Sequence, residues 1–281
     1  MTKATKKEVS REVGLEVGSI CGKFFFKLDH LHYGYWNGNI EVNISNLHLA
    51  QDAYVEFILS HIPDGVKTIL DVGCGMGQLA KILIDKGFNV DCLSPSAYLN
   101  RHVRDLLGDK TRIFECIYEE LNTPNRYDMV LFCESFQYID VEKALTKTQK
   151  LLNDNGVMLI CDVFRRDTAD KGLMGGGHKL SKFFETIEQY PFELLENKDI
   201  TEQTAPNMDI YNDILVNVMQ PVITAGMRFS ESRYPTISKI LQWKFRKKID
   251  KLDKKYFSGG RSGEDFMKYK TYRFLLYRKK A

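Results

Sequence analysis

The sequence predicts an α/β fold whose core is a mostly parallel β-sheet. Five short apolar runs have the length and composition of strands buried on both faces. Segments with helical periodicity separate most of these runs, and such alternation is typical of βαβ units. The chain has 281 residues, 43% of them apolar, which is enough for one large domain with a buried core.

Before the first strand, the sequence predicts two helices with an aromatic turn between them. Residues up to Lys27 alternate charged and small apolar side chains, and Ser45 to His61 places apolar residues at helical spacing. The turn between these helices, residues 31–38, reads LHYGYWNG. A Pro-Asp-Gly triplet at 63–65 ends the second helix.

The strands and helices of the sheet follow in order. Expected strands lie at 68–72, 89–93, 112–116, 129–133 and 157–161, and expected helices at 78–86, 97–107 and 141–152. A glycine-rich loop, 164–179, leads to a helix at 180–189 and a sixth strand at 192–200. The last strand, 270–277, is rich in aromatic and apolar residues. About 65 residues separate these last two strands, and they are mostly helical by pattern, so we interpret them as an inserted cap rather than a loop.

Charge is distributed unevenly along the chain. The whole sequence has 40 Lys and Arg against 37 Asp and Glu, but from Glu231 onward the count is 16 against 5. The body is therefore acidic and the C-terminal part basic. No apolar run predicts a transmembrane helix, and the charged first residues do not predict a secretory signal. Six scattered cysteines without a CxxC pair favour neither a disulfide scaffold nor a metal site, so we expect a cytoplasmic protein without bound metal.

The strongest motif is a glycine loop, DVGCGMG at residues 71–77, between the first buried strand and a helix. Glycines there let the backbone turn sharply and approach a bound nucleoside closely. The spacing G-x-G-x-G differs from the G-x-G-x-x-G that binds a dinucleotide pyrophosphate. Asp71, at the start of the loop, can either accept hydrogen bonds from loop amides or pair with a cationic amine.

Residues 68–162 resemble the core of class I S-adenosylmethionine-dependent methyltransferases. The glycine loop is similar to that family's D-x-G-x-G-x-G cofactor loop, YDMVL at 127–131 to its F-D-x-V strand, and LLNDNGV at 151–157 to its L-L-x-P-G-G turn. The resemblance implies a Rossmann-like, seven-stranded sheet with helices on both faces and an antiparallel last strand. We therefore divide the chain into N-terminal helices with an aromatic lid (1–62), a cofactor-binding core (63–201), a helical cap for the acceptor (202–268) and a last strand (269–281).

The same resemblance implies a set of S-adenosylmethionine contacts. Many family members end the second strand with Asp or Glu, which binds the cofactor's ribose; here Ser94 offers one hydroxyl and should bind it more weakly. The segment 31–36 is similar to one that closes over the cofactor in sarcosine/dimethylglycine, tocopherol and cyclopropane-fatty-acid methyltransferases, although an ordinary hydrophobic turn is the alternative. The adenine is expected near 116–119. The expected cofactor contacts are Tyr33, Trp36, Asp71, Gly73, Cys74, Gly75, Gly77, Ser94, Pro95, Tyr118, Glu119, Cys133 and Gln137.

Three residues are candidates for a catalytic base or for orienting the acceptor: Glu134, His178 and His32. Methyl transfer is an in-line displacement that depends on alignment, and it needs a base only when the acceptor must lose a proton. Glu134 could instead bind the cofactor or cap a helix. For His178 an exposed position at a helix start, and for His32 simple packing, are the favoured alternatives.

The cap is expected to select the acceptor. Its first part, 208–227, is rich in Met, Val, Ile and Tyr and suits an adaptable apolar wall. Its second part, 237–257, places apolar residues on one helical stripe and Lys and Arg on the opposite face. We expect this helix to pack on the domain with its charges in solvent. The alternatives are that it lies on an anionic membrane or attracts an anionic acceptor.

Together these features predict an enzyme that methylates a small-molecule or lipid-like metabolite. One alternative is an RNA methyltransferase that uses the basic C-terminal region. It is disfavoured because CESF at 133–136 differs from the N/D-P-P-Y/F turn of base-modifying members, and no separate RNA-binding module is visible. The other alternative is a non-catalytic protein that binds S-adenosylmethionine, which the intact glycine loop disfavours. The sequence leaves the methylated atom and the oligomeric state open.

Overall fold

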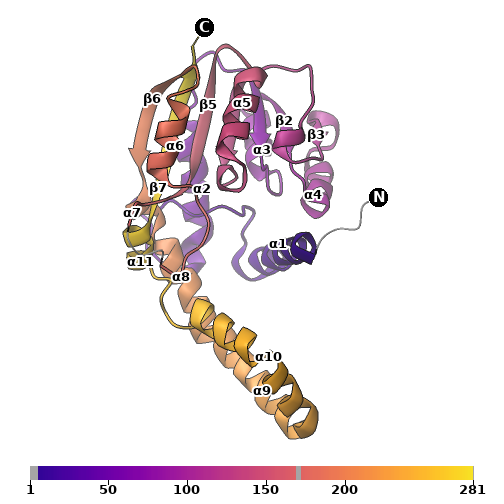
Figure 1. Ribbon diagram of the computed structural model, residues 1–281. Coiled ribbons are helices and arrows are strands. Elements are labelled where there is room, and N and C mark those ends of the chain that lie inside the picture. The colour runs from indigo at the N-terminus through magenta and orange to yellow at the C-terminus, as the bar shows by residue number, and fades with distance from the viewer. Residues whose placement is uncertain (1–5, 169–171, 281) are drawn as a thin grey trace.

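The computed structural model describes residues 6–168 and 172–280, which form a seven-stranded sheet flanked by helices (Figure 1). The strand order is β3-β2-β1-β4-β5-β7-β6. Neighbours among β1–β5 pair in parallel, and β7 is antiparallel to both β5 and β6. This confirms the predicted fold class, including the antiparallel last strand. The strands are β1 Thr68–Val72, β2 Asn89–Leu93, β3 Ile113–Phe114, β4 Tyr127–Cys133, β5 Leu152–Arg165, β6 Phe192–Asp199 and β7 Lys270–Lys279.

Two strands differ in length from the prediction because of their neighbours. The edge strand β3 is shorter than expected, since it pairs only with β2 and at only two positions. By contrast, β5 is longer, because β7 pairs with it from Val157 to Arg165 and β4 pairs with it from Leu152. Pairing partners far away in the sequence, rather than local composition, set these ends.

Alternate residues of the central strands divide the core into two halves. Ile69 of β1 belongs to an apolar cluster with residues of α2, α3 and α4, whereas its neighbour Leu70 belongs to a cluster with residues of α5 and α6. The sheet is thus covered on both faces, as a parallel sheet requires. The helices before β6 are α1 Lys6–Phe26, α2 Leu47–Leu59, α3 Gln78–Asp85, α4 Ala97–Leu107, α5 Val141–Leu151 and α6 Leu180–Ile187.

The insertion between β6 and β7 is helical, and part of it leaves the body of the molecule. Its helices are α7 Thr201–Thr204, α8 Pro206–Asp213, α9 Gln220–Arg233, α10 Pro235–Tyr256 and α11 Gly263–Tyr269, with a π-helical stretch, Ile214–Met219, between α8 and α9. In Figure 1, α9 and α10 lie side by side and project away from the sheet. Among residues 6–168 and 172–280, no helix combines the length and apolar character needed to cross a bilayer.

The expectation that the basic helix packs on the domain was wrong. In α10, Ser238 is buried and its Oγ lies 3.1 Å from Ser230 Oγ of α9, so α10 packs on α9. Ile237 and Leu252 of the apolar stripe, however, are 58% and 52% exposed, and Trp243, which lies outside that stripe, is 82% exposed. The amphipathic pattern was real, but part of its apolar surface faces solvent.

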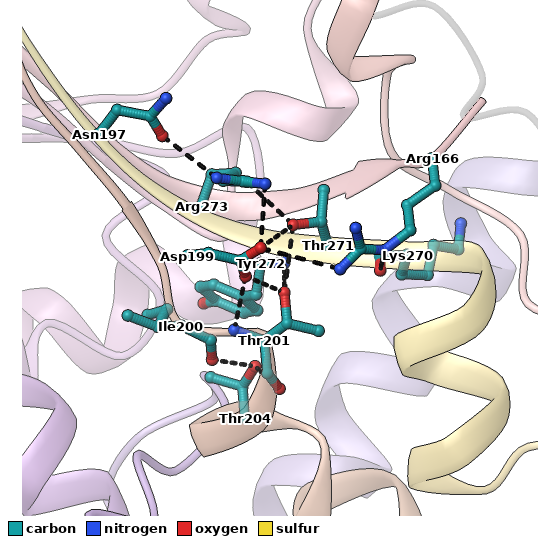
Figure 2. Close-up of polar contacts among 10 residues, drawn as sticks. All are labelled: Arg166, Asn197, Asp199, Ile200, Thr201, Thr204, Lys270, Thr271, Tyr272 and Arg273. Atoms are coloured by element: carbon teal, nitrogen blue, oxygen red, sulfur yellow. Dashed lines mark hydrogen bonds and ion pairs between the residues drawn. The ribbon is translucent and has the colours of Figure 1, made fainter.

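A polar cluster fastens the start of the insertion to the sheet (Figure 2). Asp199, at the end of β6, accepts hydrogen bonds from the backbone N–H of Thr201 (3.0 Å) and from Thr271 Oγ1 (3.3 Å), and it pairs with Arg273 (2.9 Å). Burial alone would raise the pKa of Asp199, but hydrogen bonds from the side chain and backbone of Thr201 and the charges of Arg273 and Arg166 lower it. The carboxylate therefore joins β6, β7 and the first turn of α7.

Candidate active site

A cavity of about 370 Å³ opens at the carboxyl ends of β1, β2 and β4, where open α/β sheets place their ligands. The glycine loop and the turns after β2, β3 and β4 form its walls. Residues 29–32 and Leu15 of α1 also line it. The cavity therefore brings together three strand ends and the N-terminal segment.

The backbone of the glycine loop requires glycine at two positions. Gly73 has φ +79°, and a Cβ there would overlap Ser135. Gly75 has φ +56°, and its Cβ position faces open space, with Leu31 Cδ1 at 4.0 Å as the nearest atom. Since Gly75 lines the cavity, a side chain there would occupy ligand space.

Asp71 is buried beneath this loop without a partner for one of its oxygens. It is 2% exposed, and its Oδ2 has no hydrogen bond among the described residues. The amides of Gly73 and Cys74 donate instead to Leu93 O, at 2.8 and 3.4 Å. Of the two roles foreseen for Asp71, the structure thus favours pairing with a cation. Burial raises the pKa of Asp71 to about 7, and a cation beside it would favour the carboxylate.

The turn after β2 joins the cavity to the N-terminal helix. Ser94 and Pro95 line the cavity, and Ser94 Oγ accepts a hydrogen bond from Ser96 N at 3.2 Å. Ser96 caps α4 through Leu99 N and donates to Glu12 Oε2 of α1 at 2.8 Å. These bonds hold α1 next to the wall formed by the β2 turn.

The wall after β3 contains Tyr118 and Glu119, the two residues that were expected near the adenine. The Tyr118 hydroxyl lies 2.8 Å from Thr148 Oγ1 in the core, so this hydroxyl is already engaged. Glu119 is the remaining polar side chain of the pair. Cys74 and Cys133 also line the cavity. A hydrogen bond with Cys92, together with burial, raises the pKa of the Cys74 thiol, and burial raises the pKa of the Cys133 thiol.

Glu134 lines the cavity directly after β4, in a left-handed conformation with φ +57°. Its Oε1 accepts hydrogen bonds from the backbone N–H of Tyr33 (2.6 Å) and from the Tyr272 hydroxyl (2.7 Å). Burial raises the pKa of Glu134 to about 8, although these two hydrogen bonds oppose the shift. A carboxyl group with a pKa near neutrality, fixed at a cavity wall, is suited to proton transfer.

The aromatic segment, residues 31–38, contributes Leu31 and His32 to the cavity wall. Its two predicted cofactor contacts, Tyr33 and Trp36, lie elsewhere. Tyr33 does not line the cavity; its ring lies against Tyr211, Phe266 and Tyr272. Trp36 is also absent from the lining and packs with Leu47, Ala50 and Ile210. The Tyr33 contribution is its backbone N–H, which holds Glu134.

Two helices hold this segment in place. Asn207 of α8 accepts from Gly34 N (2.8 Å) and donates to Gly34 O (2.7 Å). Gln51 of α2 donates to His30 O (3.2 Å) and His32 O (2.6 Å). The segment therefore links the insertion and α2 to the cavity.

The two candidate histidines occupy different environments. His32 lines the cavity and stacks on Tyr54, with ring centroids 4.4 Å apart. Burial, with a smaller effect of His30, lowers the pKa of His32 to about 3, so its imidazole stays neutral and is a weak base. His178 lies outside the lining, where its Nε2 donates to Phe136 O at 3.2 Å. This contact agrees with a structural role for His178.

Two other predicted contacts do not line the cavity. Gln137 donates its backbone N–H and its side-chain amide to Asp162, at 3.0 and 2.9 Å, and so fastens the turn after β4 to β5. Gly77 has φ +86° and precedes α3, with Val103 beside it. Both residues lie in segments whose neighbouring residues line the cavity.

Sequence reasoning missed several residues of the site. Asp29 and His30 line the cavity just before the aromatic segment, and Tyr138 lines it after β4. Tyr272 is 138 residues from Glu134 in the sequence and reaches it only because β7 pairs with β5. No local signal identifies Tyr272, whereas the polar residues at 29 and 30 adjoin a segment that was already predicted to form part of the site.

Known proteins resemble the chain in sequence and in fold. Residues 46–200, more than half of the chain, match the family described as methyltransferase domain. The ubiquinone biosynthesis O-methyltransferase of Rickettsia prowazekii (strain Madrid E) is 27% identical over 228 residues, covering 72% of this chain and 90% of the relative.

Solved structures share the fold at lower identity. The cyclase SpnF has a TM-score of 0.68 at 18% identity, covering 99% of this chain and 97% of that one. Geranyl diphosphate C-methyltransferase from Streptomyces coelicolor A3(2), solved with Mg²⁺, geranyl diphosphate and S-adenosylhomocysteine, has a TM-score of 0.62 at 17% identity, covering 99% and 100%. At these identities the structures show the shared fold alone.

The cavity fits the cofactor of this family. Asp71 offers an unpaired, buried carboxylate oxygen to a cationic amine, and Gly75 leaves open space where a side chain would stand. The family match and the relative favour a small-molecule enzyme over an RNA methyltransferase or a non-catalytic protein. The chain belongs to the methyltransferase-domain family and is an S-adenosylmethionine-dependent methyltransferase of small molecules.

Proposed function

We propose that the chain methylates a hydroxyl oxygen of a small, lipid-like acceptor, with Glu134 as the base. The observation that carries this proposal is the Glu134 carboxyl group at the cavity wall. Tyr33 N–H and the Tyr272 hydroxyl both bind Oε1, which leaves the second carboxyl oxygen to take a proton. A base is needed when the acceptor is a hydroxyl, because its oxygen must lose a proton during the transfer.

When bound, S-adenosylmethionine would supply a methyl carbon on a sulfonium, with S-adenosylhomocysteine as the leaving group when a nucleophile attacks that carbon in line. The protein has to align the acceptor and exclude water. The acceptor hydroxyl gives its proton to Glu134, and its oxygen electron pair forms the new bond to the methyl carbon as the carbon–sulfur bond breaks and its electron pair stays on sulfur. Burial keeps the pKa of Glu134 near 8, so the ionised base becomes more abundant as the pH rises toward 8.

We assign the other predicted contacts by their position. Asp71 pairs with the cofactor's amine, and the loop residues Gly73, Cys74 and Gly75 lie against the cofactor. Ser94 and Pro95 face its ribose, and Tyr118 with Glu119 faces its adenine. The neutral imidazole of His32, whose Nε2 lacks a partner among the described residues, orients a ligand hydroxyl. The insertion between β6 and β7 supports acceptor specificity.

The names of a relative and of a structural neighbour support an acceptor that has an apolar chain and an anionic group. The Rickettsia relative is named for ubiquinone biosynthesis, and the Streptomyces structure holds geranyl diphosphate, an apolar chain with an anionic end. The basic C-terminal part of this chain agrees with an anionic group on the acceptor. We further propose that the protein acts in the cytoplasm, with peripheral contact to a membrane.

The test is a transfer assay with purified full-length protein. Phenols with and without prenyl tails are incubated with S-adenosylmethionine, and methylated product is measured by mass spectrometry. Glu134→Gln should lower turnover by about 10²–10⁴-fold while calorimetric affinity for S-adenosylhomocysteine stays within a few fold. The exposed Glu142→Gln of α5 is the matched control. Unchanged turnover of Glu134→Gln would exclude Glu134 as the base.

A further inference from the structure

The α9–α10 hairpin, residues 220–256, exposes apolar side chains on both of its helices. Scattered exposed apolar residues are common, but a group of large ones on one projecting element indicates a partner. In Figure 1 the hairpin points away from the sheet and its covering helices. Large apolar or aromatic residues exposed by more than half are Val222 (62%), Phe229 (71%), Tyr234 (54%), Ile237 (58%), Ile240 (56%), Trp243 (82%) and Leu252 (52%).

The same hairpin is strongly basic. It has ten Lys and Arg against three Asp and Glu, a balance of +7, whereas the whole chain has +3. In α10 the exposed apolar residues Ile240 and Trp243 share one helix face with Lys244 and Lys247, because these positions are spaced i, i+3, i+4 and i+7. Lysine stems can lie along apolar surface while their ammonium groups reach outward. This mixture is typical of helices that lie in a membrane interface.

We propose that the α9–α10 hairpin docks on an anionic lipid bilayer. Trp243 and its apolar neighbours enter the headgroup and upper acyl region, and the lysines contact lipid phosphates. The positive charge of the hairpin, together with its exposed apolar residues, favours an anionic bilayer over the other partners. A second copy would oppose +7 with +7, and a nucleic acid would pair with the lysines but leave Ile240 and Leu252 in water. The docking does not depend on the proposed acceptor.

Vesicle binding of the full chain tests this inference. Phosphatidylcholine vesicles with and without phosphatidylglycerol are sedimented with the protein at low and high salt. We expect binding only to the anionic vesicles, and weaker binding at high salt. The sequence has two tryptophans, and Trp36 is buried while Trp243 is exposed. Binding should therefore shift the Trp243 emission to shorter wavelength.

Charge-matched variants separate local from overall electrostatics. Lys247→Glu with Lys251→Glu should weaken binding at least about 30-fold, since each basic residue near an anionic surface contributes roughly fivefold. Lys143→Glu with Lys150→Glu changes the net charge equally on exposed positions of α5 and should change binding far less. Trp243→Ala should weaken it about tenfold or more through lost apolar burial.

Several results would overturn the inference. One is absence of binding to anionic vesicles; another is equal loss in the two charge-reversed pairs. A dimer seen by sedimentation velocity and abolished by the hairpin variants, without vesicle binding, would identify a second copy as the partner. An RNA gel shift without vesicle binding would identify nucleic acid. Affinity for S-adenosylhomocysteine, measured in the same samples, keeps these outcomes separate from failure of the proposed reaction.

Discussion

Asp71 should make the free protein less stable as the pH rises, and its replacement by Asn should remove this effect. The carboxyl group is 2% exposed, and burial raises its pKa from 3.8 to about 7. The folded protein therefore holds this proton more tightly than the unfolded chain. Its stabilising effect is complete below the unfolded pKa and is lost as the pH rises through the folded one.

The size of the effect follows from the two pKa values. Each unit of difference corresponds to 1.36 kcal/mol, and between pH 5 and 8.5 the change in unfolding free energy amounts to roughly 3 kcal/mol. In Asp71→Asn the side chain stays neutral, so this pH-dependent loss disappears. The variant should gain roughly 3 kcal/mol on the wild type across that interval.

Urea unfolding of both proteins at pH 5, 6, 7, 8 and 8.5 measures this difference. Other buried carboxyl groups, such as Asp162, titrate in both proteins and cancel in the comparison. Asp105→Asn on α4, an exposed position, is the matched control and should follow the wild type. If the unfolding free energies of Asp71→Asn and the wild type change with pH in the same way, within about 1 kcal/mol, then folding does not raise the pKa of Asp71.

Four further predictions test the site and its surroundings. Asp71→Asn should weaken S-adenosylhomocysteine binding about 10–100-fold in calorimetry, because a charge-assisted bond is lost; equal affinity would show that no cation pairs there. Gly75→Asp should abolish S-adenosylhomocysteine binding while the circular dichroism spectrum stays native. Retained affinity would show that the cofactor does not lie against this loop. Asn207→Ala should lower the unfolding free energy by about 1–3 kcal/mol and speed amide exchange at Gly34; unchanged exchange would mean that the bond does not hold the segment. Replacing 220–256 with a short Gly-Ser linker should leave cofactor affinity within twofold, and a large loss would make the hairpin part of the cofactor site.

Local sequence patterns correctly predicted the central strands and the glycine loop, because burial and backbone angles at these positions are reflected in the residues themselves. The run Thr68–Val72 is apolar because β1 is buried on both faces, and the glycines after it are required by backbone angles within the same loop. The ends of β3 and β5, by contrast, depend on which strands pair with them. That pairing is a property of the whole sheet, so composition alone could not set these ends.

The amphipathic pattern of α10 illustrates a different limit. Helical spacing identifies an apolar stripe, but it does not say what covers that stripe. Packing on the domain was the default expectation, and the structure instead leaves Ile237 and Leu252 of the stripe more than half exposed. The uneven charge noted in the sequence turns out to be informative here, because much of the basic excess lies on the projecting hairpin.

The contacts that sequence reasoning missed explain how Glu134 is held in place. Glu134 follows β4, but its two hydrogen-bond donors come from the N-terminal segment and from the last strand. The N-terminal segment is in turn bound by Asn207 of the insertion. A carboxyl group with hydrogen bonds from both sides cannot rotate freely, so its orientation depends on peripheral elements being packed. The orientation of Glu134 therefore depends on the aromatic segment, the insertion and β7 together, three parts of the chain that lie far apart in the sequence.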